Sequence, residues 1–289
     1  NYLQSKISPL TNSNELVAFK QASPAVIFLA RAGADARAKY LSGHLDSAFF
    51  ADLNIDLADI KQSPAEGGRH PLPDPYKFSK FINSLGIDAN TRVVVYDDKN
   101  GSNAAARFWW MLRSAGHSNV QVLDGGFDDA VKAGFPVKAG EESKTVNSDY
   151  HTGNWQLPIA NMNEVDKAVK DDDFIVIDVR DADRFRGERE PFDPVAGHIP
   201  GAVNIPFTSN LDIDGHYLPA GELRKKYLDA LDGIESEHVI VHCGSGVTAC
   251  HTILAMEHAG LGIPKLYVGS WSEWVGNNMP VATLNKKNE

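Results

Sequence analysis

The sequence predicts an α/β protein with two tandem domains, each a mostly parallel sheet with helices on both faces. Three observations support this prediction. The chain of 289 residues exceeds the usual size of one domain. Short apolar runs typical of buried strands alternate with helix-type segments, as they do in parallel α/β sheets. The pattern recurs after roughly 150 residues, which is the length of a domain rather than of a solenoid repeat.

The first copy, residues 1–135, alternates predicted strands with predicted helices. The strands are short apolar runs, and the helices stop at Gly86 and Gly116, because glycine favours a helix end. In chain order we expect the strand Val26–Leu29, the helix Tyr76–Leu85, the strand Arg92–Tyr96, the helix Ala104–Ala115 and the strand Val120–Leu123.

The second copy, residues 159–289, repeats this plan. The segment GHIPGAVNIPF from Gly197 corresponds to GHLDSAFFADL from Gly43. Residues 136–158 between the copies are polar and contain two glycines and two prolines, so we predict a linker there. The strands of the second copy are expected at Phe174–Ile177, Val239–Val241 and Lys265–Val268.

Composition narrows the function classes. The net charge of −10 disfavours nucleic acid and anionic membranes as partners. No apolar run reaches the about 18 residues that a membrane-spanning helix needs. The two cysteines lie close together in the sequence, so a disulfide framework is not expected and a reducing, cytoplasmic location fits. We expect no cofactor and no metal.

Cys243 lies at the junction of a predicted strand and a predicted helix. Gly244, Ser245 and Gly246 follow it, and glycine permits the tight turn in which backbone N–H groups crowd together. The start of the next helix adds partial positive charge. We therefore expect a thiolate at Cys243 to be stabilised, which makes it the candidate nucleophile.

The repeat breaks at this position. The strand-end residue corresponding to Cys243 is Asp97 in the first copy, and the turn GSGVT becomes DKNGSN. We interpret the second copy as catalytic and the first as an inactive copy.

Four chemistries compete for a thiolate in such a loop. A phosphatase-type nucleophile needs an arginine about six positions later, where Ala249 stands. GSGVTA fits a glycine-rich dinucleotide pattern, but the next strand, KLYVG, lacks the acidic residue that this pattern requires. His242, Cys243, Cys250 and His251 lack the spacing of a metal site. The fourth hypothesis is that the cysteine carries a sulfur atom as a persulfide.

The sequence resembles the two-domain rhodanese superfamily over nearly its whole length. The matching features are CGSGVTAC from Cys243, GHIPGAVNIP from Gly197, DVRDADRFRG from Asp178, and RFWWMLRSAGH with VLDGG in the first half. The loop CGSGVT is similar to that of the 3-mercaptopyruvate sulfurtransferases. Thiosulfate sulfurtransferases of this architecture tend to carry basic residues after the cysteine.

This resemblance implies two rhodanese-like domains and a sulfur-transfer reaction. The Cys243 thiolate would take the sulfur atom of 3-mercaptopyruvate, release pyruvate and pass the sulfur to cyanide, a thiol or reduced thioredoxin. The implied partners are thus a small anionic sulfur donor and a thiol or thioredoxin-like acceptor. A thiosulfate:cyanide enzyme is the alternative, and a non-catalytic persulfide carrier is the rival from another class.

The resemblance also assigns site residues. Arg184 matches the substrate-binding arginine of the family. A second family arginine falls at Asp193, so Arg189 or Arg186 would have to substitute for it. Ser245 and His70 match a Ser-His-Asp relay whose acid would be Asp56 or Asp52. The loop residues Gly244, Gly246, Val247 and Thr248 complete the expected substrate-binding set.

Several other prominent residues are expected to be structural. Arg180 should form an ion pair with Asp178 beneath the loop. His44 and His198, each after a glycine, should tie their own turns to backbone. The tryptophans expected in the core are Trp109, Trp110, Trp271 and Trp274.

Overall fold

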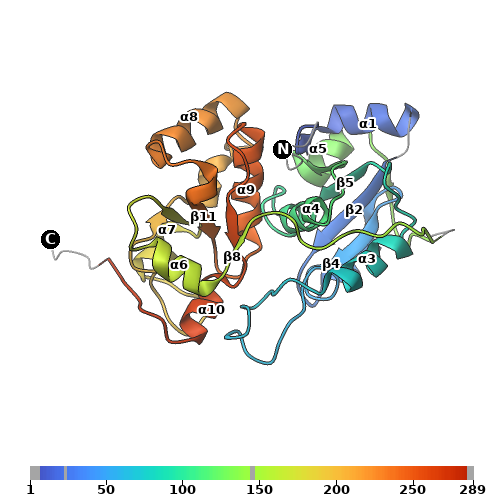
Figure 1. The fold of residues 1–289 in the computed structure, drawn as a ribbon. Coiled ribbons are helices and arrows are strands. Elements are labelled where there is room, and N and C mark those ends of the chain that lie inside the picture. Colours follow the sequence, from blue (N-terminus) through green and yellow to red (C-terminus); the bar gives the residue numbers. More distant parts are fainter. Residues whose placement is uncertain (1–6, 23–24, 144–146, 285–289) are drawn as a thin grey trace. The chain divides into compact units, whose positions relative to one another are not determined.

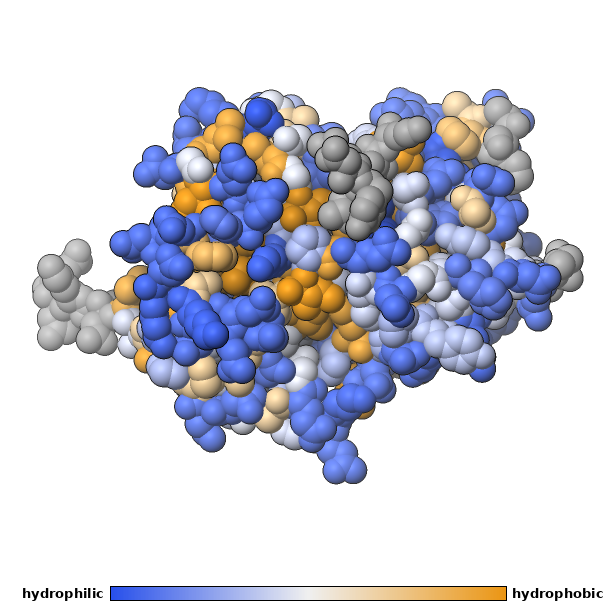
Figure 2. Space-filling model, viewed as in Figure 1, coloured by the Kyte–Doolittle hydropathy of each residue, from blue (hydrophilic) through white to orange (hydrophobic). Residues whose placement is uncertain are grey.

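The computed structural model describes residues 7–22, 25–143 and 147–284, and the chain divides into two compact units. Unit 1 comprises Asn1–Asp59, Leu72–Leu157 and Ile213–His216. Unit 2 comprises Ile60–Pro71, Pro158–Asp212 and Tyr217–Glu289. Each unit thus holds most of one repeat and a short segment from the other. Hydrophilic residues cover most of the face seen in Figure 2, as the composition predicts.

Unit 1 is built on a parallel five-stranded sheet in the order β1-β6-β5-β2-β4. A separate antiparallel pair joins β3 (His44–Leu45) to β7 (Val137–Lys138), so the first residues of the predicted linker pair with unit 1. The five strands of the main sheet are β1 (Leu10–Thr11), β2 (Val26–Arg31), β4 (Phe49–Asp52), β5 (Val93–Tyr96) and β6 (Val120–Leu123).

Helices cover both faces of this sheet. Ile27 and Leu29 of β2 pack in one cluster with residues of α1, α2 and α5, whereas Phe28 points the other way and contacts Phe81 and Phe108. This alternation is the period of two expected for a strand buried on both faces. The helices are α1 (Ser13–Ala22), α2 (Ala36–Ser42), α3 (Pro75–Ser84), α4 (Ala104–Ser114) and α5 (Gly126–Lys132), and Figure 1 shows them around the sheet.

Unit 2 repeats the architecture. Its parallel sheet has the order β10-β9-β11-β12-β8, which is the order of unit 1 read from the other edge. The strands are β8 (Ile159–Ala160), β9 (Ile175–Asp178), β10 (Val203–Asn204), β11 (Val239–His242) and β12 (Lys265–Tyr267). The helices are α6 (Met162–Ala168), α7 (Ala182–Arg186), α8 (Ala220–Leu231), α9 (Thr248–His258) and α10 (Ser270–Gly276), with short 3-10 turns at Phe207–Asn210 and Ser236–His238.

In each unit, the strand register identifies the residue that follows the central strand. In unit 1, Leu29 of β2 lies opposite Tyr96 of β5, and in unit 2, Asp178 of β9 lies opposite His242 of β11. The next residue along each central strand is Asp97 in unit 1 and Cys243 in unit 2. Each of these residues thus directly follows the central strand of its unit, which is the position that the sequence indicated.

The predicted fold class is confirmed, although several short elements of the structure were not predicted. The two-residue strands β1 and β8 were not predicted, because they are too short to show a hydrophobic period. The predicted core tryptophans Trp109, Trp110, Trp271 and Trp274 are all buried. Among the described residues, no helix combines the length and the apolar character needed to cross a membrane.

Candidate active site

Cys243 lies at a strand–loop–helix junction in unit 2, as predicted. β11 ends at His242, Cys243 follows, and α9 begins at Thr248. The strand is central, because it pairs with β9 on one side and β12 on the other. The loop between them therefore lies at the carboxyl end of the sheet, where open α/β folds place ligands.

The start of α10 holds the loop in shape. The N–H groups of Trp271 and Ser272 donate to the carbonyls of Cys243 and Gly244, at 3.0 and 2.9 Å. The Ser270 hydroxyl accepts from the Cys243 N–H at 3.2 Å and donates to the Tyr267 carbonyl at 2.9 Å. Ser270 itself has a φ of 55°, a strained conformation for a residue other than glycine. Nothing in the sequence pattern pointed to Ser270.

Gly246 brings a backbone donor to the sulfur. Its N–H donates to Cys243 Sγ at 3.2 Å, and Cys243 is 4% exposed. A φ of 79° and a Cβ that would lie 2.3 Å from the Val268 carbonyl oxygen exclude other residues here. Cys250 Sγ lies 3.5 Å from the Gly246 carbonyl oxygen and donates to it. At least one backbone N–H of the loop, that of Gly246, thus points at the thiol, as the glycine pattern led us to expect.

Two guanidinium groups converge over the loop at Gly244. A Cβ added to Gly244 would lie 3.1 Å from Arg69 Nη2 and 3.2 Å from Arg184 Nη2. Arg184 is the cation that the sequence predicted, on α7. Arg69 comes from the segment Ile60–Pro71 of the first repeat, which belongs to unit 2. Sequence reasoning singled out its neighbour, His70, but not Arg69.

Carboxylates orient both guanidinium groups. Arg184 Nη2 donates to Glu190 Oε1 at 2.9 Å, and Arg69 Nη1 pairs with Asp193. The side chains of Glu190 and Asp193 are each 3% exposed. Because both acids are buried and paired with the arginines, they hold the two guanidinium groups in position. Asp193, which stands where the resemblance places the second arginine, thus pairs with a cation from another segment, Arg69.

An aromatic ring lies beneath the two cations. The guanidinium carbons of Arg69 and Arg184 each lie 5.3 Å from the centre of the Phe192 ring. Phe192 is 68% exposed, which is unusual for a large apolar side chain. The ring stacks against both planar groups and limits their movement.

Arg180 forms the predicted structural ion pair below the loop. It donates to the Asp178 carboxylate through Nε at 3.0 Å and Nη2 at 2.7 Å, and it lies over the Trp271 ring. Burial opposes its charge, but attraction to Asp178, Glu190 and Cys243 raises the pKa of Arg180. Burial likewise opposes the charge of Asp178, yet His242 and Arg180 keep the pKa of that carboxyl below its usual value. The site thus holds a permanent cation close to the thiol.

The other predicted site residues fall into two groups. Ser245 and Val247 are buried in the loop, Thr248 begins α9, and His70 is half-buried directly after Arg69. Arg189 is different, because the structure does not bring it to the loop. It is half-exposed and pairs with Asp183 and Asp181.

Three further predicted residues are placed as follows. His44 Nδ1 lies 2.9 Å from the Tyr40 carbonyl oxygen, and His198 Nδ1 lies 2.7 Å from that of Phe185, so both histidines tie their turns to backbone as predicted. Asp56 lies in unit 1 and accepts from the Asp52 N–H. Burial, together with the charge of Asp52, raises the pKa of Asp56 to about 6.

Comparison with known proteins identifies the family. The model of the rhodanese family, described as "Rhodanese-like domain", matches residues 18–133 and again residues 161–277. The chain therefore belongs to the rhodanese family and carries two copies of its domain, as the repeat predicted.

Similar proteins place the chain among sulfurtransferases. A Pseudomonas aeruginosa protein named "Probable 3-mercaptopyruvate sulfurtransferase" is 40% identical and is matched over 84% of this chain and 86% of its own. The thiosulfate sulfurtransferase of Gallus gallus is 36% identical over 83% and 81%. The solved structure of the 3-mercaptopyruvate sulfurtransferase from Leishmania major has a TM-score of 0.80 at 31% identity, over 93% of this chain and 75% of that chain. The predicted enzyme class, a sulfurtransferase, is confirmed.

Proposed function

We propose that this enzyme moves sulfur from 3-mercaptopyruvate to a thiophilic acceptor through a persulfide on Cys243. The observation that carries the proposal is the hydrogen bond from the Gly246 N–H to Cys243 Sγ, at 3.2 Å. A donor aimed at the thiol stabilises the thiolate before attack and the terminal sulfur anion afterwards, as an oxyanion hole stabilises developing charge. The names of the relatives from Pseudomonas and Leishmania support this donor.

In the proposed reaction the Cys243 thiolate attacks the sulfur of the donor. An S–S bond forms, the C–S bond of the donor breaks, and its electron pair leaves with pyruvate as the enolate. Arg184 and Arg69 bind the donor carboxylate, because both guanidinium groups lie over Gly244, next to the nucleophile. We assign Ser245 and His70 to proton transfer between the donor thiol and the enolate. The acceptor, which is cyanide, a thiol or a thioredoxin, then takes the outer sulfur.

The choice of donor rests on where the positive charge lies. The residues Gly244–Thr248 contain no lysine or arginine, whereas a dianion such as thiosulfate gains most from charge within the loop itself. The two arginines instead approach Gly244 from outside the loop, where they can bind a carboxylate at the other end of the donor. Thiosulfate:cyanide transfer remains the alternative, and the name of the Gallus relative favours it.

The proposed location is the cytoplasm. Cys243 and Cys250 are both free thiols in the structure, and free thiols persist where the environment is reducing. A thiol or thioredoxin-like acceptor is also abundant in such a compartment.

Paired cysteine variants test the proposal. We expect Cys243→Ser to abolish transfer and Cys250→Ser to retain most of it, because serine keeps a donor to the Gly246 carbonyl. Equal losses in the two variants would overturn the assignment of Cys243. Measuring kcat/KM for both donors on one preparation decides between mercaptopyruvate and thiosulfate.

Mass spectrometry distinguishes a catalytic sulfurtransferase from a non-catalytic persulfide carrier. Incubation with donor should add one sulfur atom to Cys243, and cyanide should then remove it with turnover. A persulfide that forms but is never transferred would show a non-catalytic carrier.

A further inference from the structure

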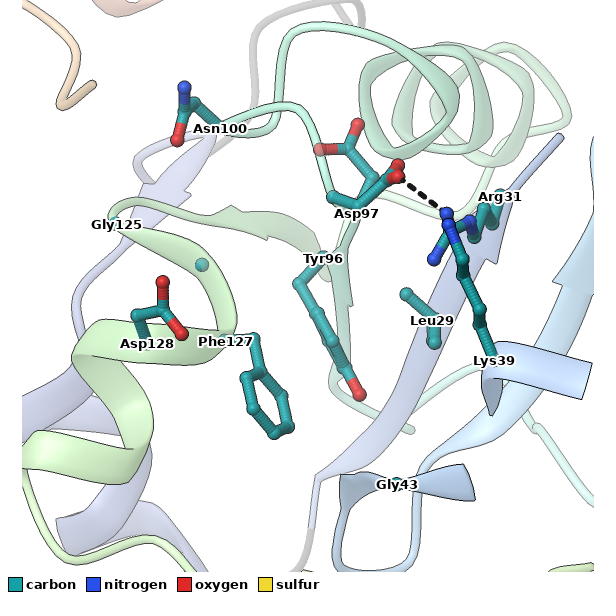
Figure 3. A pocket seen from close by; sticks show the side chains of 12 residues that line it. Leu29, Arg31, Lys39, Gly43, Tyr96, Asp97, Asn100, Gly125, Phe127 and Asp128 are labelled. Carbon is teal, nitrogen blue, oxygen red and sulfur yellow. Dashed lines mark ion pairs between the residues drawn. The ribbon is translucent and has the colours of Figure 1, made fainter. Parts of the chain in front are cut away.

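Unit 1 has a cavity at the carboxyl ends of its central strands. Its volume is about 290 Å³, and it lies where β2, β5 and β6 end (Figure 3). Ligands of open α/β sheets bind at this edge. The volume is at the lower limit for small-molecule pockets, so a molecule the size of a metabolite fits best.

In unit 1, the Asp97 side chain occupies the position that corresponds to Cys243 in unit 2. The Asp97 carboxylate accepts four backbone hydrogen bonds from its own loop, which come from the N–H groups of Lys99, Gly101, Asn103 and Ala105 at 2.8–3.1 Å. Asp97 is 3% exposed. Because the Asp97 carboxyl group occupies the amide cradle, other residues must recognise any ligand of this cavity.

Opposite charges face each other across the cavity. Figure 3 shows Arg31 and Lys39 on one side and Asp128 on the other. Arg31 pairs with Asp98 at 3.1 Å and keeps 14% of its side chain exposed. Within the described part of the chain, Lys39 pairs with the exposed Asp35, and such a surface pair contributes little and leaves the ammonium available.

The surface between the charges is apolar. Leu29, Tyr96 and Phe127 lie there in Figure 3, and the rings of Tyr96 and Phe127 are stacked with centres 6.4 Å apart. The Tyr96 hydroxyl accepts from the Leu45 N–H at 2.9 Å, so its ring is held in place. Gly125 and Gly126 line the same cavity and leave backbone accessible.

We propose that this cavity binds a small zwitterion of the α-amino-acid class. The carboxylate faces Arg31 and Lys39, the ammonium faces Asp128, and an apolar side chain packs on the Tyr96 and Phe127 rings. A simple anion would meet the Asp128 carboxylate, and a simple cation would meet the two bases. A molecule with both charges satisfies both sides. The site is separate from the sulfur-transfer residues of unit 2 and does not depend on the proposed function.

Three matched probes test the charge pattern on the full chain. L-Valine carries both charges, isobutylamine lacks the carboxylate, and 3-methylbutanoate lacks the ammonium. In titrations followed by the NMR signals of the Leu29 methyl groups, we expect L-valine to bind at least about tenfold more tightly than either half-molecule. Equal binding by one half-molecule, or no saturable shift with L-valine, would overturn the proposal.

Single substitutions test whether L-valine binds in this cavity. Lys39→Met and Asp128→Asn should each weaken L-valine binding about tenfold, whereas Lys132→Met, which removes a charge from the same unit outside this cavity, should leave it unchanged. Cys243→Ser should bind L-valine like the wild type. Circular dichroism confirms that each variant is folded, and an equal loss in Lys132→Met would contradict the assignment.

Discussion

The Arg69 guanidinium pairs with the buried carboxylate of Asp193. The family resemblance places an arginine near position 193, and an acid there suggested that a cation was missing. The structure supplies the cation from a different segment and uses the acid to orient it. Donor recognition in this enzyme can therefore be tested at Arg69.

Arg69→Met should weaken donor binding. Loss of one charge-assisted hydrogen bond to a carboxylate costs roughly 1.5–3 kcal/mol, which corresponds to a fall of about 10- to 100-fold in kcat/KM for mercaptopyruvate. Steady-state kinetics measure this change. Arg189→Met is the matched control, because Arg189 pairs with Asp181 and Asp183 on the surface, and it should change kcat/KM less than about twofold. A larger fall in kcat/KM for Arg189→Met than for Arg69→Met would show that Arg69 does not bind the donor carboxylate.

Asp193→Asn should act through Arg69. The variant removes the charge that orients the guanidinium, so we expect a smaller rise in KM than in Arg69→Met. The two effects should not add in the double variant, because residues in contact couple energetically. Strict additivity would mean that Asp193 affects the site by another route.

Replacing Gly244 by alanine should impair donor binding, whereas replacing Gly246 by alanine should lower stability. The atoms nearest to a Cβ at Gly244 are the guanidinium nitrogens of Arg69 and Arg184 rather than backbone, so Gly244→Ala should keep the melting temperature and lose donor binding. A Cβ at Gly246 meets the backbone oxygen of Val268, at a φ of 79°, so Gly246→Ala should cost more than about 2 kcal/mol of stability. Thermal unfolding and donor KM, measured together, distinguish these outcomes.

Stability should fall in mild acid because of His251. Burial lowers the pKa of His251 to about 3 from its ordinary value of 6.5. As the pH falls below 6.5, the unfolded chain takes up a proton that the folded chain refuses, so stability is lost between about pH 6.5 and 3. This group alone should remove about 1.4 kcal/mol between pH 7.5 and 5.5.

Urea unfolding at the two pH values measures this loss. His251→Gln should lower stability at pH 7.5, because His251 Nδ1 lies 2.8 Å from the Tyr217 hydroxyl. The same variant should flatten the pH dependence by the contribution of one histidine. An unchanged slope would show that other groups control the acid sensitivity.

The sequence was sufficient for the fold because each central strand is apolar on both faces and the whole pattern is duplicated. It was sufficient to place Cys243 between a strand and a helix, because a strand end, a turn with two glycines and a helix start follow one another. These are local patterns, and local patterns survive in a single sequence. Even the correspondence of Asp97 with Cys243 could be obtained by counting from the strand ends.

The second cation could not be predicted in this way. Arg69 lies 174 positions before Cys243 in the sequence, and its loop has no periodicity that indicates where it packs. Arg189 has the better spacing from Arg184, but two nearby aspartates hold it on the surface. Ser270 gave no signal at all, because its role depends on a backbone conformation that only the folded chain shows.

The assignment of Ile60–Pro71 to unit 2, and of Ile213–His216 to unit 1, has a consequence for how the duplicated gene can evolve. A break at Leu157 would leave the half that holds Cys243 without Arg69 and His70, which are encoded in the other half. Neither unit is therefore encoded by one continuous stretch of the gene, and we expect either half expressed alone to lack part of its unit.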